Sequence, residues 1–337
     1  MEVLVDSEIL GVWLIRSKKL MAGRLVPIQN EFDSVSLVEI GARFKNDLDG
    51  TIAWCRQHGL LATRMDCPGC GHYCNPQNAP DRIDLRTWRC MNKNCKRRIN
   101  IRYGSYFEKS HLKLWQVLGL TYIWSTNAGR SRGMAQDTVR HELSIVGEHT
   151  VVDWFQFCRD VPVDYFLTHG VPIGGPGHIV EIDESLFARR KYNRGRLVPE
   201  QWIFGGYDQQ TKEGFLVPVP RRDAATLLPI IQQWVFPNTT VWSDMWAAYN
   251  NLGQLGYQHG TVNHSLNFVD PVTGVCTNRV EAMWQRSKSK FKAMHGPTNR
   301  AMIPDYLAEF MWAQRFGGPQ AYFNFWSQVA MMYQVLQ

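Results

Sequence analysis

The sequence predicts an α/β protein in which a zinc-binding ribbon and a helical region precede a domain of alternating strands and helices. Two closely spaced cysteine pairs lie within 61–110, apolar residues recur at helical spacing within 111–170, and strands alternate with helices within 171–316. We expect an N-terminal helical region at 1–60 and a C-terminal helical tail at 317–337. These segments define the expected domains, because each periodicity belongs to one type of element.

The N-terminal half is expected to be helical on both sides of the ribbon. Residues 34–44 and 48–58 have the spacing of short amphipathic helices, and helical patterning returns from about 112 to 158. Pro162 and the glycine-rich 171–177 mark a domain boundary.

Two cysteine pairs predict a structural metal site. Cys67 and Cys70 are separated by 19 residues from Cys90 and Cys95, and each pair can offer two thiolates to one tetrahedral ion. Four thiolates leave no open coordination position, so we expect structural zinc rather than catalytic zinc, with buried free cysteines as the alternative. Cys74 is a rival ligand.

A second helical pair follows the ribbon. Residues 134–143 and 149–157 are expected to be helices joined by a turn at 144–147 that contains a glycine. This pattern fits a helix-turn-helix that reads DNA and also fits an ordinary helical hairpin. Both interpretations stay open.

The region after 171 alternates strands and helices. Three strands are followed by a helix, a strand, a helix, a strand and a helix, at 178–187, 201–207, 214–220, 224–235, 239–244, 247–255, 258–264 and 277–294. This is the order of an RNase H-like domain, although many α/β folds share most of it.

The charge distribution favours a nucleic-acid partner. The net charge is +7 and hydrophobic residues make up 45% of the chain, so the chain can bury a core. Eleven Lys or Arg and one acid lie between Leu85 and Arg132, a larger excess than that of the whole chain. Aromatic residues are interleaved with these charges: Trp88, Tyr103, Tyr106 and Trp115. Such a mixture is more typical of nucleic-acid binding than of a solvated basic face.

The sequence argues against export and membrane insertion. The start MEVLVDSEIL is acidic and lacks a basic n-region. No apolar run approaches the ~18 residues that a membrane span needs. We therefore expect no membrane partner, and we expect the eight cysteines to be reduced.

Three acids predict a catalytic metal site. Asp183 and Asp244 lie near the ends of two expected strands, and Glu281 lies on the last expected helix. Carboxylates from two neighbouring strands and a helix can meet in one pocket, where Mg²⁺ or Mn²⁺ takes oxygen ligands and activates a water or a 3′-hydroxyl. Neighbouring side chains remain open as alternatives: Glu181, Glu184, Asp208, His259 and His264.

Basic residues beside the ribbon and the acids are expected to contact DNA phosphates. They are Lys96, Arg97, Arg98, Arg102, Arg189, Arg190, Lys191, Lys288 and Lys292. Lys288 is two helical turns beyond Glu281, so both side chains share one face of the expected helix.

Seven stretches within roughly 65–316 form a further pattern: CPGCG, WRCMNKNCKRRINIRYGSYFE, VEIDESLFARRKYNRGR, WIFGGYD, VWSDMWAAY, VNHSLNFVDPVTG and TNRVEAMWQRSKSKFK. In this order they resemble the Merlin superfamily of DDE transposases and its bacterial insertion-sequence relatives. The resemblance implies a zinc ribbon before an RNase H-like core, with the DDE triad at Asp183, Asp244 and Glu281 and the family's following Lys at Lys288. The 36 residues between Asp244 and Glu281 are a spacing typical of Merlin elements. Relatives usually carry His where this chain has Cys276.

The resemblance also implies an activity and partners. It implies a transposase that binds the terminal inverted repeats of its element in double-stranded DNA, cuts there, and joins the ends to target DNA with Mg²⁺ or Mn²⁺. It implies a homodimer or larger homo-oligomer, and a nuclear location if the source is eukaryotic. Two alternatives stay open: a domesticated DNA-binding protein without transposition activity, and a non-transposing RNase H-like nuclease. The intact acids disfavour the first, and the basic ribbon disfavours the second.

Overall fold

The computed structural model describes residues 35–188, 200–293 and 300–336, which form two compact units. Unit 1 comprises the described residues up to Thr126, Met134–Thr168 and the residues from Gly318 onwards. Unit 2 comprises Asn127–Gly133 and His169–Gly317. Unit 1 therefore collects segments from both ends of the described chain, and unit 2 is nearly continuous.

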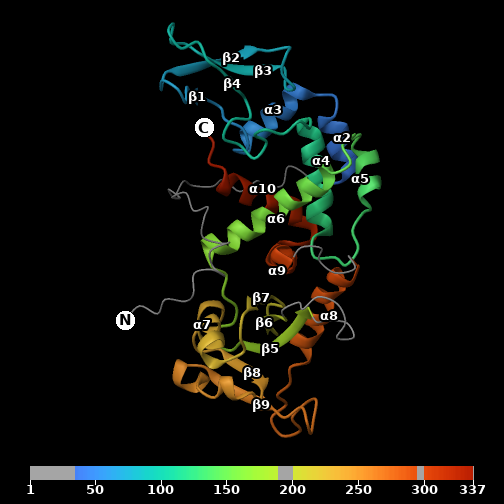
Figure 1. The fold of residues 1–337 in the computed structure, drawn as a ribbon, viewed down its shortest axis with the longest axis vertical. Coiled ribbons are helices and arrows are strands. Elements are labelled where there is room, and N and C mark those ends of the chain that lie inside the picture. The colour runs from blue at the N-terminus through green and yellow to red at the C-terminus, as the bar shows by residue number, and fades with distance from the viewer. Residues whose placement is uncertain (1–34, 189–199, 294–299, 337) are drawn as a thin grey trace. The chain divides into compact units, whose positions relative to one another are not determined.

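The ribbon of unit 1 is a four-stranded antiparallel sheet in the order β1-β2-β3-β4 (Figure 1). Its strands are β1 Met65–Asp66, β2 Tyr73–Asn78, β3 Arg86–Cys90 and β4 Arg98–Asn100. Trp88 on β3 is buried, and the Arg56 guanidinium lies 5.4 Å from its ring centre. Strands this short bury little apolar surface alone, so the ribbon needs further stabilisation.

Helices form most of the rest of unit 1. They are α2 Leu37–Phe44, α3 Leu48–Gln57, α4 Leu114–Asn127, α5 Gln136–Glu142, α6 Thr150–His169 and α10 Ala321–Met332. Ser36 and Asp47 cap α2 and α3 with side-chain oxygens that accept backbone N–H bonds, which confirms the two N-terminal helices expected from the sequence. No helix in the described ranges is long and apolar enough to cross a bilayer.

The end of α6 corrects the expected boundary at Pro162. This proline lies inside α6, which continues to His169. A proline removes one helical hydrogen bond, but Pro162 and its neighbour Val161 are both buried, so packing holds the helix together across it. The change of unit comes after Thr168, just before the glycine-rich stretch.

The core of unit 1 is aromatic. The Tyr106 ring makes edge contacts with Trp154, Phe325 and Trp326, at centroid distances of 5.7, 6.0 and 5.8 Å. The two last rings belong to α10, so the C-terminal helix completes this core. Of the four aromatics interleaved with the basic residues, Trp88, Tyr106 and Trp115 are buried and Tyr103 is exposed. Most of that aromatic pattern therefore stabilises the fold.

Unit 2 is built on a five-stranded sheet in the order β7-β6-β5-β8-β9 (Figure 1). Its strands are β5 Ile179–Ala188, β6 Gln201–Asp208, β7 Gly214–Val219, β8 Thr240–Asp244 and β9 Gln258–Val262. The first three pair antiparallel, and β8 and β9 run parallel to β5. Every expected strand of this domain is present, with bounds that shift by one or two residues.

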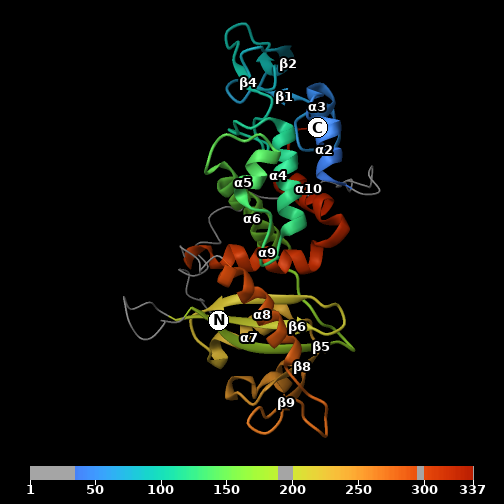
Figure 2. The same ribbon diagram turned by 90° about the vertical axis from the view of Figure 1, so that its right-hand side faces the viewer.

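Helices cover both faces of this sheet (Figure 2). They are α7 Ala224–Trp234, α8 Asn278–Ala293 and α9 Ile303–Phe316, with short 3-10 turns η1 Ala247–Tyr249, η2 Leu252–Leu255 and η3 Arg300–Met302. Trp234 of α7 stacks on Phe215 of β7, at 5.7 Å between centroids. On the opposite face, α8 approaches so closely that a Cβ on Gly205 would lie 2.6 Å from the Trp284 ring.

Two features of unit 2 differ from expectation. The helix expected at 247–255 is two 3-10 turns, because Asn250, Asn251 and Gly253 interrupt it with residues that favour turns. Residues 127–133 join unit 2 rather than the preceding helices: the Gly129 N–H donates to the buried Glu309 carboxylate at 3.1 Å, and Glu309 also pairs with Lys290.

Arg102 serves the fold of unit 1 instead of the DNA contact expected for it. Its side chain is 1% exposed and pairs with Asp84, which is also 1% exposed, through two bonds of 2.6 Å. A third guanidinium nitrogen donates to the carbonyls of Ser110 and Leu112. The guanidinium is thus fully engaged and has no face left for a phosphate.

We expect Arg102→Ala to destabilise unit 1 by about 3–5 kcal/mol, because the Asp84 carboxylate would be left buried without a partner. Chemical denaturation followed by circular dichroism measures this loss. Lys96→Ala, which removes an exposed cation of the same unit, should change stability by less than about 0.5 kcal/mol. An Arg102→Ala protein of normal stability that binds DNA poorly would restore the DNA role for this residue.

Candidate functional site

Four cysteines of the ribbon are arranged to hold one metal ion. The Sγ atoms of Cys67 and Cys95 are 3.7 Å apart and those of Cys70 and Cys90 are 3.4 Å apart, and all four lie within 4.8 Å of one another. A tetrahedral zinc with bonds of about 2.3 Å separates its sulfurs by about 3.8 Å. The four sulfurs therefore lie close to the positions that one tetrahedral zinc requires.

The backbone around the first pair favours thiolates. The N–H of His72 lowers the pKa of Cys70 to about 6, and the N–H of Gly69 lowers the pKa of Cys67. Burial raises the pKa of Cys90 to about 12, so a bound cation is needed to keep that sulfur ionised. The tight turn after Cys70 needs Gly71, whose φ is +71°.

Cys74 lies outside this group. Its thiol is buried, burial raises its pKa, and its Sγ lies 3.7 Å from the His72 carbonyl. The remaining three cysteines, Cys55, Cys158 and Cys276, are also buried and free. The geometry thus selects the four cysteines expected from the spacing over the rival Cys74.

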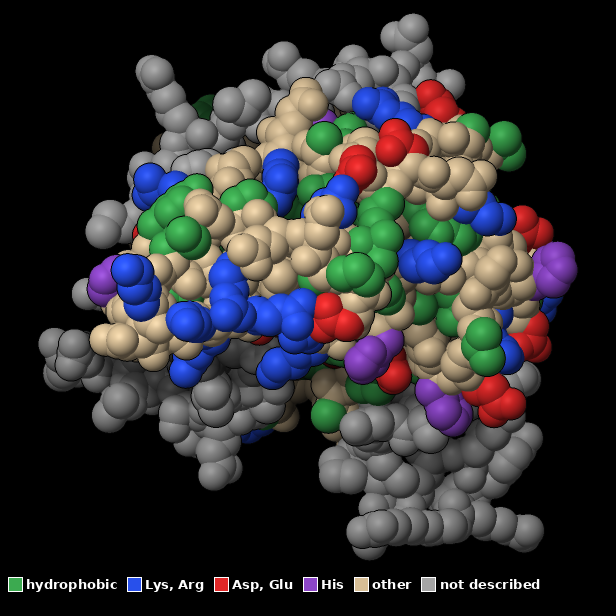
Figure 3. All heavy atoms as spheres, turned by 90° about the horizontal axis from the view of Figure 1, so that it is seen from above, with side chains coloured by type: hydrophobic (Ala, Val, Ile, Leu, Met, Phe, Trp, Pro, Cys, Tyr) green, Lys and Arg blue, Asp and Glu red, His purple; other side chains and the backbone are tan. Residues whose placement is uncertain are grey.

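Exposed cations lie beside the cysteines. Lys96, Arg97 and Arg98 are exposed, and Arg98 pairs with Asp81 at 2.7 Å. Figure 3 looks down on the end that carries β1–β4 in Figure 1 and shows Lys and Arg side chains gathered on this face. A basic surface of this kind suits a polyanion.

In unit 2, Asp183 and Asp244 lie at corresponding positions of neighbouring parallel strands. The last paired residues of β5 and β8 are Glu181 and Trp242, and the two aspartates lie two residues beyond them. The negative charge of Asp244 contributes to a raised pKa at Asp183, which indicates that the carboxylates lie near each other. Both side chains are half-buried.

Asp183 has an environment that disfavours its ionised form. Burial, followed by the charges of Glu184 and Asp244, raises its pKa to about 7, while a 3.0 Å bond from the Trp284 indole N–H partly opposes that rise. A carboxylate in this state gains strongly from a nearby cation. Perturbation by burial and by specific charged neighbours is typical of functional acids.

Glu181 holds the start of α8 against β5. Its carboxylate is fully buried and accepts the backbone N–H groups of Arg279 at 2.7 Å and Val280 at 3.0 Å, together with the side chains of Gln209 and Arg279. The first N–H groups of a helix lack helical partners and attract negative charge. Sequence reasoning left Glu181 as an alternative metal ligand, but its oxygens are occupied by this capping role.

Two further contacts fasten α8 along the same strand. The Trp284 indole bonds Asp183, as above, and Lys288 Nζ donates to Ser185 Oγ at 2.6 Å. Burial lowers the pKa of Lys288, and the negative charge of Asp183 counters part of that effect. Lys288 therefore lies within electrostatic reach of Asp183.

Glu281 lies on the first turn of α8 and is held by a short hydrogen-bond chain. Thr277 Oγ1 donates to Glu281 at 3.2 Å, and His264 lies 2.8 Å from the same hydroxyl. A hydroxyl has one proton, so it accepts from His264 Nε2 while donating to the acid. His264 thus orients Glu281 through Thr277. Cys276, the residue before Thr277, is buried next to these hydrogen bonds.

Asp183, Asp244 and Glu281 do not all lie within metal-binding distance of one another. Among the residues that the structure describes, the four cysteines alone bring three or more potential metal ligands within 4.8 Å. Glu281 is instead turned toward Thr277 and His264.

The other expected residues fall into three groups. Lys292 is exposed on α8, whereas Arg189, Arg190 and Lys191 lie outside the described residues. Asp208 is fully buried and bonds His178 at 2.8 Å and the Gly174 and Gln210 N–H groups, so it pins turns together.

Glu184 points to the opposite face of β5 from Asp183. It accepts from the Tyr249 hydroxyl, and burial raises its pKa while the positive charge of Arg222 partly opposes the rise. Arg222 therefore lies within electrostatic reach of this acidic corner. His259 bonds Ser243 at 2.8 Å, next to Asp244.

Known proteins are similar to this chain. Residues 172–314 match the family model described as an ISXO2-like transposase domain. A Haemophilus influenzae protein named "Uncharacterized transposase-like protein" is 30% identical over 99 residues, which are 29% of this chain and 77% of that protein. A chain of the simian T-cell lymphotropic virus intasome, solved with PP2A regulatory subunit B56 gamma, is similar at 15% identity and a TM-score of 0.28. That match covers 53% of this chain and 64% of the other, less than two thirds of it, and a TM-score this low supports no inference.

We expect the purified protein to contain about one zinc ion per chain, because four thiolates complete one tetrahedral site. Cys70→Ser and Cys90→Ser should each lose the metal and unfold the ribbon, since metal binding supplies the folding energy of such modules. Elemental analysis with circular dichroism measures both effects. Cys74→Ala is the matched control and should keep its zinc; loss of zinc from this variant would contradict the ligand set.

We expect Asp183→Asn to change how stability depends on pH in the presence of a chelator. The Asp183 pKa is raised from 3.8 to about 7, so folding favours the protonated form. The stability from this source is fully present below the unfolded pKa and is lost as pH rises through about 7. Because Asn cannot ionise, the variant should match the wild type near about pH 4 and exceed it by at least about 1 kcal/mol near about pH 8. A difference in the free energy of unfolding between wild type and Asp183→Asn that does not change between these pH values would contradict the raised pKa of Asp183.

Proposed function

Because the chain belongs to the ISXO2-like, insertion-sequence type of transposase family, we propose that it cuts and rejoins DNA with Asp183, Asp244 and Glu281 as the ligands of catalytic Mg²⁺ or Mn²⁺. The observation that carries this proposal is the nearness of Asp183 on β5 to Asp244 on β8, beside the helix α8, whose first turn carries Glu281 and is held against β5 by Glu181. The raised pKa of Asp183 supports a site that is completed by cations.

We propose that the sheet of unit 2 is an RNase H-like core. Its strand order β7-β6-β5-β8-β9, with an antiparallel half followed by parallel strands, supports this proposal. In this arrangement the central strand β5 carries the first acid and its neighbour β8 carries the second. Fold alone does not imply the reaction, so the acids carry the functional argument.

The chemistry assigned to the site is phosphoryl transfer. Bound divalent cations would activate the attacking water or 3′-hydroxyl and stabilise the leaving oxygen. Asp183 and Asp244 offer hard oxygen ligands from rigid strands, and Glu281 offers a third from a helix end held by Glu181. Lys288, beside Asp183, provides a positive charge for a DNA phosphate at the cleavage point.

The zinc ribbon and its exposed cations are proposed to hold double-stranded DNA at the terminal inverted repeats. Lys96, Arg97 and Arg98 neutralise phosphates, which fixes the register of the protein on the duplex. The helices α5 and α6 are candidates for reading sequence. A transposase holds two DNA ends together, so we propose a homodimer or a larger homo-oligomer.

The assignment to Merlin within this broader family, and the nuclear location that it implies for a eukaryotic source, stay predictions. The second candidate function is a domesticated DNA-binding protein that keeps the ribbon and the core. The presence of all three acids, with Lys288 within electrostatic reach of Asp183, favours the enzyme, because DNA binding alone requires no carboxylates.

We expect Asp244→Ala to reduce cleavage of terminal-repeat DNA by at least about a hundredfold, the scale on which one stabilising group at a reacting centre contributes. Specific end binding should survive, because the ribbon and helices carry it. A cleavage assay on labelled ends, run with Mg²⁺ and with Mn²⁺ beside a binding assay, measures both properties. Asp183→Ala and Glu281→Ala should behave in the same way.

The matched control is Glu213→Gln, which neutralises a carboxylate of the same unit that pairs with Arg315 at 2.8 Å. This variant should cut at the wild-type rate. Asp208→Ala is unsuitable as a control, because Asp208 is buried and holds turns together. Wild-type cutting by Asp244→Ala would overturn the triad, and a wild type that binds ends without cutting would favour the domesticated protein.

A further inference from the structure

Two tryptophans and an arginine lie together beside the second acid of the site. The Arg222 Cζ is 3.8 Å from the ring centre of Trp202 and 5.4 Å from that of Trp246. We call these three residues the indole shelf. They come from the start of β6, the segment before α7 and the segment between β8 and η1, so three separate segments build it.

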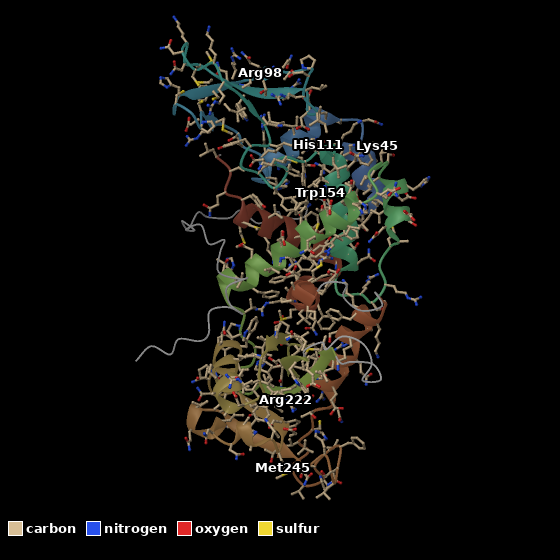
Figure 4. All side chains as sticks on the ribbon, in the orientation of Figure 1. Lys45, Arg98, His111, Trp154, Arg222 and Met245 are labelled. Carbon is tan, nitrogen blue, oxygen red and sulfur yellow. The ribbon has the colours of Figure 1, made fainter. Side chains whose placement is uncertain are left out.

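Trp246 is both exposed and fixed in place. It is 44% exposed, and the neighbouring Met245 is 65% exposed. The Trp246 backbone N–H donates to Asp244 Oδ1 at 3.0 Å, and its indole N–H donates to the Arg222 carbonyl at 2.9 Å. Figure 4 marks Arg222 and Met245 among the elements of unit 2. A large ring held in one orientation while exposed to water is pre-organised for a ligand.

The chemistry of the shelf points to one kind of ligand. Indole rings and guanidinium planes stack on flat aromatic groups, and the positive charge of Arg222 suits a ligand that carries phosphate. Arg221, the preceding residue, is exposed and lies 3.9 Å from the Asp223 carboxylate, so it adds a cation whose charge is partly paired. A nucleobase offers its face only when it is unpaired, because stacking in a duplex covers both faces.

We propose that the indole shelf stacks an unpaired base of a DNA strand next to the acids. This proposal rests on the proposed function, because it places the base beside the strand that the acids cut. The direct bond between the Trp246 backbone and Asp244 means that a base on the shelf lies adjacent to the second acid. The proposal therefore narrows the substrate from duplex DNA to a DNA end in which one base is displaced from the duplex.

An abasic scan tests the proposal. The probe is a labelled duplex with a short single-stranded tail, in a series where each tail position in turn carries an abasic sugar. Binding is measured by fluorescence anisotropy in chelator, so that no cutting occurs. For the wild type, one abasic position should weaken binding by about fivefold or more, as expected when a stacked base is lost.

Trp246→Ala should bind the intact probe about as weakly as the wild type binds that abasic probe, and the same abasic position should then have no further effect. Trp246→Phe keeps an aromatic face and should retain most of the difference. Since the Asp244 contact uses the Trp246 backbone, neither variant removes it directly. Phe236→Ala, which removes an exposed ring of unit 2 outside the shelf, is the control and should behave as the wild type does.

A scan that is the same for wild type and Trp246→Ala overturns the proposal. If the scans are the same and Trp246→Ala also forms a smaller assembly in size-exclusion chromatography, the indole shelf is an interface between copies of the chain. If the protein cuts labelled ends but its abasic scan does not depend on Trp246, the transposase function stands and the proposed base stacking on the indole shelf is wrong. If the abasic scan depends on Trp246 but the protein never cuts DNA, the proposed base stacking stands and the proposed catalytic function is wrong.

Discussion

The attachment of one helix to one strand determines the geometry of unit 2. Glu181, Asp183 and Ser185 alternate along β5, and they bond the start of α8, Trp284 and Lys288 in turn. Two strand residues advance about 6.6 Å and four helical residues advance about 6 Å. Every second residue of β5 therefore meets every fourth residue of α8 over three contacts. Gly205 on the next strand supplies the space that lets Trp284 lie this close. The third acid is placed through this attachment, because Glu281 lies on the turn that Glu181 caps.

This arrangement combines rigidity with electrostatic cost. Glu181 is buried but satisfied by four hydrogen bonds, so its charge stabilises the start of the helix. Asp183, two residues on, accepts bonds from the Trp284 indole and the Glu184 backbone, but it is largely buried beside other acids, and its ionised form is disfavoured. The same strand therefore carries one acid that is structurally complete and one that gains from a cation. That contrast distinguishes the capping acid from the candidate metal ligand.

Local patterns in the sequence were sufficient for the strands, for most of the helices and for the cysteine site. Strand alternation and the two short cysteine spacings depend on neighbouring residues, and the structure has the strands and gathers the expected sulfurs. Long-range partners had no such signal. Arg102 follows a basic run and has the composition of a phosphate contact, but its partner Asp84 is 18 residues away in a buried pair. The capping role of Glu181 depends on N–H groups nearly 100 residues later, and the raised pKa of Asp183 depends on burial.

The place of α10 in unit 1 has a consequence for biosynthesis. Phe325 and Trp326 are fully buried against a core that is otherwise formed by residues before Thr168, and unit 2 is translated in between. On the ribosome, unit 2 can therefore fold while unit 1 still lacks part of its interior. A nascent chain that stops before α10 would carry the acids on a folded sheet but leave the aromatic core beside the ribbon incomplete. The order of translation thus delays completion of the basic unit until the acid-bearing unit has emerged.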